Sequence, residues 1–148
     1  MRSSPNSFLV IGGALSTLAA LLHLGCIAFG PSWYRFFGAG EQMARLAASG
    51  SNYPALVTTV IALVLLTWAL LAFSGAGLVR KLPLLRTGLV LVTAIYLIRG
   101  AAVLPLMTHV PGRSETFWWW SSAICFTIGL IHFIGLRQVW ARLSQAAA

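Results

Sequence analysis

Residues 82–107 form an apolar run that is long enough to cross a bilayer and that carries one fixed positive charge, Arg99, well inside it. About 20 helical residues span the hydrocarbon core of a membrane. A charged side chain inside the bilayer costs about 2.5 kcal/mol or more, and it usually faces the protein interior beside a polar partner. The run therefore predicts a membrane helix and, elsewhere in the chain, polar groups that surround Arg99.

The composition allows four such helices. Of the 148 residues, 59% are hydrophobic and 8% are charged, whereas soluble domains contain about 25% charged residues. We expect membrane spans at about residues 7–29, 53–73, 83–107 and 117–137, within a single domain that covers residues 1–148. The predicted fold is all-α: a compact, antiparallel four-helix bundle in the membrane, with an interfacial segment between the first two spans.

The segment that connects the first two spans is expected to lie on the membrane surface. It places aromatic residues around a basic one, a composition typical of membrane interfaces: Trp33, Tyr34, Phe36 and Phe37 around Arg35. A short helix is predicted over about residues 40–48, where Glu41 and Arg45 have the i,i+4 spacing of a helix pair. Glu41 either makes this exposed pair or folds over the mouth of the bundle as a counter-charge.

The basic residues predict the orientation of the chain. With the N-terminus inside, the inner side holds Arg2, Arg80, Lys81, Arg86, Arg137 and Arg142, and the outer side holds Arg35, Arg45 and Arg113. The positive-inside rule then places both termini in the cytoplasm, and we assign the chain to the cell inner membrane. Because the net charge of +8 is scattered along the chain, we expect contacts with anionic lipid headgroups and no binding of nucleic acid.

A layer of polar side chains is the strongest functional signal in the sequence. At about 1.5 Å per helical residue, Arg99 and His23 both lie about 10 Å below the outer membrane surface. The same depth is reached by Thr58 and Thr59 on the second span and by Ser121 and Ser122 on the fourth. Tyr96 lies one turn deeper on the face of Arg99. These residues, together with Glu41, form the predicted ligand-binding site.

Arg99 lacks a counter-charge within the spans, because the two acidic residues, Glu41 and Glu115, both lie outside them. The missing negative charge must come from one of these residues, from a lipid phosphate or from a bound anionic ligand. Otherwise the side chain extends outwards to water and headgroups. A guanidinium presents five donors in a planar fork that suits carboxylate or phosphate.

The histidines and cysteines predict neither a metal site nor a disulfide. For His23 three roles stay open: a packing residue, a proton acceptor or, by itself, a metal ligand. His132 is expected about 12–15 Å from it in depth, too far for both to bind one haem iron. Cys26 and Cys125 differ by about 10 Å in depth, which is too far for a bridge. No residue is assigned as catalytic or as a metal ligand, and the identity of a cofactor stays open.

The leading hypothesis is a non-enzymatic protein that binds a lipid headgroup, a quinone-like molecule or a small anion in the His23–Arg99 layer, or that packs as an accessory subunit against a larger membrane complex. One alternative is a membrane-embedded enzyme for a lipid-type substrate, with His23 as base, Arg99 as anion clamp and Tyr96 or Glu41 as proton donor. Another is a small oligomeric transporter or channel. The chain lacks the familiar nucleotide-binding, metalloprotease and serine-hydrolase motifs. Membrane lipids are expected partners, and assembly into a homo-oligomer or a larger complex stays open.

Overall fold

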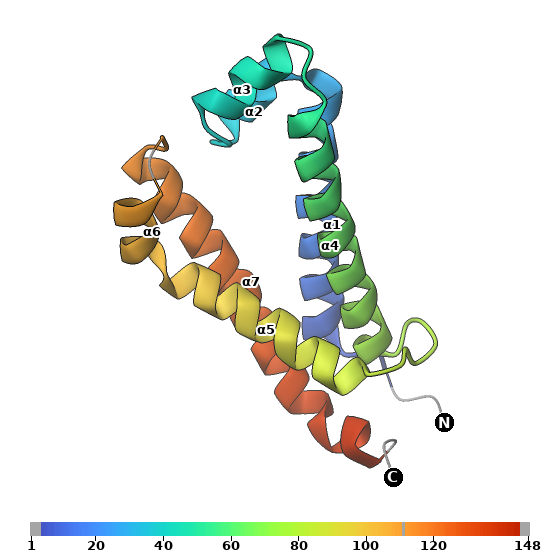
Figure 1. The fold of residues 1–148 in the computed structure, drawn as a ribbon. Coiled ribbons are helices and arrows are strands. Elements are labelled where there is room, and N and C mark those ends of the chain that lie inside the picture. Colours follow the sequence, from blue (N-terminus) through green and yellow to red (C-terminus); the bar gives the residue numbers. More distant parts are fainter. Residues whose placement is uncertain (1–3, 111, 146–148) are drawn as a thin grey trace.

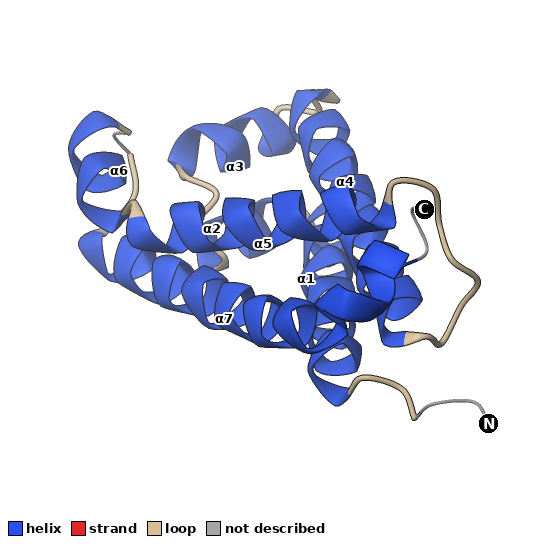
Figure 2. Cartoon of the chain, turned by 90° about the horizontal axis from the view of Figure 1, so that it is seen from below, coloured by secondary structure: helices blue, strands red, loops and turns tan. Residues whose placement is uncertain are grey.

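The computed structural model describes residues 4–110 and 112–145. Within these ranges all regular structure is helical, which confirms the predicted all-α class, and short loops join the helices (Figure 2). The helices are α1 (Ser7–Phe29), α2 (Pro31–Phe36), α3 (Glu41–Ala48), α4 (Tyr53–Ala76), α5 (Leu85–Ala101), α6 (Val103–His109) and α7 (Glu115–Gln145). Arg2, one of the predicted inner-side charges, lies outside the described residues.

The local sequence determines where the helices begin and end. The Asn6 side chain caps α1 by accepting a hydrogen bond of 3.0 Å from the Leu9 amide, which satisfies one of the free N–H groups at a helix start. Pro31 and Pro54 stand in the first turns of α2 and α4, where no N–H is needed. Gly77 ends α4 with a φ of 88°, a left-handed conformation that glycine adopts without strain. α3 confirms the short helix predicted between the first two spans.

The four long helices pair into two arms. α1 and α4 lie side by side in the first arm, and α5 and α7 lie side by side in the second arm (Figure 1). The arms converge towards the end of the molecule that holds both termini, and they diverge towards the other end. The predicted compact four-helix bundle is therefore not confirmed, because the helices do not surround one continuous core along their whole length.

The core is largest where the arms converge. A cluster of aliphatic residues from all four long helices fills this end: Leu9, Ala76, Leu85, Leu89, Leu136, Val139 and Leu143. Glycine brings the helices close together here, since a Cβ at Gly135 would lie 2.7 Å from Cγ of Leu9. A second cluster farther along the arms contains Ala20, Leu65, Val92, Tyr96 and Ile128. Many large apolar side chains on the outer faces stay exposed, as suits helices surrounded by lipid.

The arms also touch at their divergent ends. α2 and α3 cover the end of the first arm (Figure 1), where Cys26, Tyr34 and Ala44 form a small buried cluster. Arg113, just before α7, donates hydrogen bonds to the Gly38 carbonyl at 2.9 Å and to the Ala39 carbonyl at 3.1 Å. The loop between α2 and α3 is thereby attached to the second arm.

The run that predicted the third span, residues 83–107, is not one straight helix. α5 ends at Ala101, and α6 continues at an angle of 65° to it. Pro105 explains the break, because proline lacks an N–H and its ring collides with the carbonyl four residues earlier, which belongs to Ala101. As a result Arg99 lies less than one turn from the end of α5 rather than deep inside a continuous span.

Three helices are long and apolar enough to cross a membrane: Ser7–Phe29, Tyr53–Ala76 and Glu115–Leu143. The bent pair of α5 and α6 adds a fourth if the two helices are counted as one span. The described part of the chain thus has the three or four apolar helices expected of a multi-pass membrane protein.

Candidate functional site

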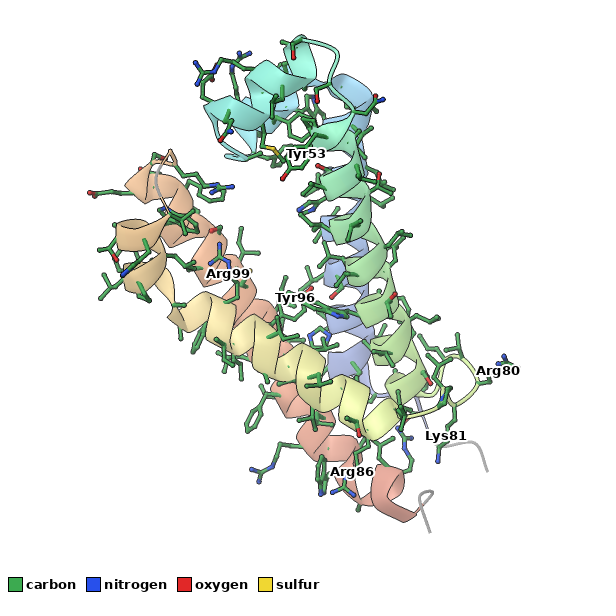
Figure 3. All side chains as sticks on the ribbon, viewed as in Figure 1. Tyr53, Arg80, Lys81, Arg86, Tyr96 and Arg99 are labelled. Carbon is green, nitrogen blue, oxygen red and sulfur yellow. The ribbon has the colours of Figure 1, made fainter. Side chains whose placement is uncertain are left out.

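Arg99 is bound by two serine hydroxyls of the neighbouring helix. Its Nη1 donates to Oγ of Ser122 at 3.0 Å and its Nη2 donates to Oγ of Ser121 at 2.9 Å. Figure 3 shows Arg99 on the second arm, towards the divergent end of the molecule. The planar guanidinium reaches both hydroxyls because its two terminal nitrogens form a fork. The structure thus brings together three of the residues that depth counting placed in one layer.

Close packing beside Arg99 makes these hydrogen bonds possible. A Cβ at Gly100 would lie 2.5 Å from the amide nitrogen of Phe126, so the α5 backbone runs directly against the α7 backbone at this level. Small residues allow such contacts between membrane helices. Gly100 therefore sets the distance across which Arg99 meets Ser121 and Ser122.

No carboxylate in the described part of the chain neutralises Arg99. Among residues 4–110 and 112–145, the one ion pair joins Arg35 to Glu41, and Glu115 is exposed at the start of α7. Both partners of Arg99 are neutral hydroxyls, and Arg99 itself is partly buried. A buried charge without a counter-charge costs several kcal/mol in an apolar environment. The site therefore carries an excess positive charge.

Trp118 extends the site towards a second arginine. The centre of its ring lies 5.2 Å from Cζ of Arg99 and 5.5 Å from Cζ of Arg113, both within the range of cation–π attraction. Trp118 is only 5% exposed, whereas Trp119 is 55% exposed and Trp120 is 69% exposed. Trp118 was not among the residues predicted to form the site. The i, i+3, i+4 spacing puts Trp118 on the helix face of Ser121 and Ser122. This spacing could have identified Trp118 as a neighbour of the two serines.

The Trp118 indole nitrogen is buried without a hydrogen-bond partner among the described residues. An indole N–H can only donate, and leaving such a donor unsatisfied costs about 1–3 kcal/mol. His132 Nε2 is the other buried side-chain nitrogen without a hydrogen-bond partner among the described residues. There the Nδ1 atom lies 2.9 Å from the Ile128 carbonyl and must carry the proton, so in the neutral ring Nε2 is a bare acceptor. Of these two buried nitrogens, only that of Trp118 therefore presents an unused N–H.

Tyr96 does not lie beneath the guanidinium of Arg99 but bridges the two arms. Its hydroxyl lies 2.9 Å from Oγ of Ser16 on α1, and Figure 3 shows the ring pointing from α5 towards the first arm. The ring also packs against His132, with 5.4 Å between the ring centres. His132 is fully buried against Gly12, where a Cβ would lie 2.7 Å from its Cε1. Tyr96 and His132 thus form a packed polar centre between the arms, near their middle.

The remaining predicted layer residues belong to the first arm. His23 Nδ1 donates to the Ala19 carbonyl at 2.7 Å, Thr58 bonds Tyr34 at 3.1 Å, and Thr59 donates to the Ala55 carbonyl at 2.8 Å. Each of these contacts stays within the first arm or its cap. The structure therefore brings Arg99 together with Ser121 and Ser122 but joins none of the first-arm residues to it by a hydrogen bond.

Glu41 pairs with Arg35 rather than with Arg45 or Arg99. The Arg35 Nε and Nη2 atoms donate to the two carboxylate oxygens at 2.9 Å and 3.0 Å. The Arg35 hydrogen bonds hold the pKa of the Glu41 carboxyl below its ordinary value. Both side chains are about half exposed, so the pair orders the surface between α2 and α3 and does not cover the Arg99 site.

The described residues contain no group of three or more His, Cys, Asp or Glu side chains that could hold a metal ion. Cys26 and Cys125 are both free. Comparison with protein-family models, curated proteins and solved structures finds no match for this chain. The chemistry of the site must therefore be derived from its own geometry.

Proposed function

We propose that this protein is a non-enzymatic membrane protein that binds an anionic or amphipathic small ligand, or an anionic lipid headgroup, at Arg99. The observation that carries the proposal is the hydrogen bonding of the Arg99 guanidinium to two neutral serine hydroxyls, with no carboxylate partner in the part of the chain that the structure describes. Intramembrane charges of this kind commonly mark ligand sites. The serines fix the plane of the guanidinium, so its remaining N–H groups are oriented before a ligand arrives.

The proposal includes the membrane arrangement. We infer an antiparallel four-span topology in the cell inner membrane with both termini cytoplasmic. In Figure 3, Arg80, Lys81 and Arg86 gather at the end of the molecule that holds the termini, and Tyr53 lies at the opposite end. All three basic residues are exposed, which fits the positive-inside rule. Arg99 then lies on the outer side.

A binding role fits the described residues better than catalysis does. An enzyme built on His23 and Arg99 would need the two side chains to converge on one substrate atom. His23 instead bonds its own helix at 2.7 Å, and Tyr96 is bonded to Ser16. A role as an accessory subunit is compatible with ligand binding, because the outer faces of both arms carry exposed apolar side chains.

Native mass spectrometry in a mild detergent tests the proposal. We expect wild-type protein purified from its membrane to carry a defined anionic adduct that Arg99→Met loses. Arg137→Met is the matched control, because Arg137 is an exposed α7 arginine that lies over the Phe133 ring, 5.9 Å from its centre. This control should keep the adduct. Equal adduct occupancy in wild type and Arg99→Met, with equal stability, would contradict the proposal.

A further inference from the structure

The ligand class of the proposed site follows from a buried donor that has no acceptor among the described residues. Trp118 is 5% exposed, and its Nε1–H has no partner among the described residues. Buried donors are nearly always paired with protein or with a bound molecule. The indole N–H can accept nothing and cannot lose its proton at ordinary pH, so only an acceptor atom can satisfy it.

Two guanidinium groups lie over the same ring. Cζ of Arg99 lies 5.2 Å and Cζ of Arg113 lies 5.5 Å from the centre of the Trp118 ring. Arg113 bonds the carbonyls of Gly38 and Ala39, which are neutral acceptors. Two positive charges and one indole donor are thus gathered around one ring, with no carboxylate bonded to either arginine within residues 4–110 and 112–145. The missing component is an anion that accepts hydrogen bonds.

The number and spread of the donors favour a phosphate group over a carboxylate. Arg99, Trp118 and Arg113 offer N–H groups from three separate side chains, and after their recorded bonds Arg99 keeps its Nε and Arg113 keeps its Nη1. A carboxylate has two oxygens in one plane, whereas a phosphate group presents its oxygens in a tetrahedron. Arginine binds phosphate through paired, charge-assisted hydrogen bonds.

The position of the three donors matches the headgroup region. Trp118 is the fourth residue of α7, and Arg99 stands two residues before the end of α5, so each lies within about 5 Å of a helix end along the axis. Trp119 and Trp120 are exposed beside them, as in the aromatic belts at membrane interfaces. These side chains therefore lie at the level where lipid phosphates are expected.

We propose, on the basis of the function proposed above, that Arg99, the Trp118 indole N–H and Arg113 together bind a phosphate group, held either by a lipid headgroup or as free phosphate. Trp118 is the donor that distinguishes this site from a simple positive patch, because its N–H has a direction and a buried position. Arg113 adds a second charge and connects the site to the α2–α3 loop.

Proton NMR of the ¹⁵N-labelled indoles tests the proposal in detergent micelles. Trp118→Phe identifies the Trp118 resonance, and Trp120→Phe is the matched control on an exposed ring. Adding phosphatidylglycerol should move the Trp118 N–H signal downfield and leave that of Trp120 in place. Trp118→Phe keeps an aromatic ring beside the arginines and removes the N–H, so it should weaken phosphatidylglycerol binding about tenfold, the equivalent of one lost charge-assisted hydrogen bond.

Parallel titrations separate the outcomes. A shift with inorganic phosphate equal to that with phosphatidylglycerol supports a phosphate site and identifies free phosphate as a sufficient ligand. Oleate that binds as tightly as phosphatidylglycerol overturns the assignment to phosphate. If Arg99→Met abolishes anion binding while Trp118→Phe binds normally and the indole signal does not move, this inference fails and the proposed function stands. If Arg99→Met also binds normally, both fail.

Discussion

Gly100 controls how closely α5 approaches α7 beside Arg99. A Cβ at this position would lie 2.5 Å from the amide nitrogen and 2.6 Å from Cα of Phe126. Favourable contacts between heavy atoms begin at about 3.5 Å, so the two helices must separate by about 1 Å to admit one methyl group. Because both colliding atoms belong to the backbone, no side-chain rotation relieves the contact.

We expect Gly100→Ala to lower the free energy of unfolding by about 2 kcal/mol. Overpacking costs about 1–3 kcal/mol, and a rigid backbone contact belongs at the upper end of this range, while alanine returns about 1 kcal/mol of helix propensity. The separation should also lengthen the hydrogen bonds from Arg99 to Ser121 and Ser122. Ligand affinity is therefore expected to fall together with stability.

Gly88→Ala on the same helix is the matched control. Its Cβ would meet Cδ1 of Leu71 at 3.0 Å, the flexible end of a side chain that can rotate away. We expect this variant to match wild type or to gain up to about 1 kcal/mol. The free energy of unfolding of both variants is measured by reversible unfolding in mixed micelles of dodecyl maltoside and dodecyl sulfate, with helical circular dichroism as the readout. A Gly100→Ala protein as stable as Gly88→Ala would refute the close backbone contact.

Three further outcomes follow from the contacts described. Tyr96→Phe should cost about 1–2 kcal/mol, because it leaves the buried Ser16 hydroxyl unsatisfied; adding Ser16→Ala should recover part of the loss in the same unfolding assay. His132→Ala should lower the free energy of unfolding by about 2–4 kcal/mol, because it leaves a cavity at a fully buried site. The same unfolding assay measures this loss. The Arg35–Glu41 pair should stabilise the α2–α3 cap at neutral pH. Since the folded pKa of Glu41 is lowered, this stabilisation is present above the unfolded pKa and is lost as the pH falls through the lower folded value, and amide exchange in α3 should rise there in wild type but not in Glu41→Gln.

The sequence predicted those features that depend on local signals or on residue counting along one helix. α1 spans Ser7–Phe29, because Asn6 and Gly30 mark its ends. Arg99 contacts Ser121 and Ser122, as a rise of about 1.5 Å per residue along each helix predicts, although α5 ends at Ala101, before the predicted end of the span.

Features that depend on packing between helices could not be obtained in this way. The depth count placed Tyr96 near Arg99, but its hydroxyl turns to Ser16 across the arms, a choice set by how two helices face each other. Pro105 was visible in the sequence, and its effect on the carbonyl of Ala101 could have predicted the bend between α5 and α6. The pairing of Glu41 with Arg35 instead of Arg45 depends on the turn between α2 and α3.

Arg113 connects the proposed phosphate site to the contact between the two arms. Ser16 and Tyr96 join the arms near their middle, and Arg113 joins them at the divergent end through Gly38 and Ala39. Arg113 therefore contacts both the first arm and the Trp118 ring. A phosphate bound by Arg113 would hold this side chain in place and strengthen the tie to the α2–α3 loop. By linkage, whatever loosens that tie should weaken phosphate binding by the same factor.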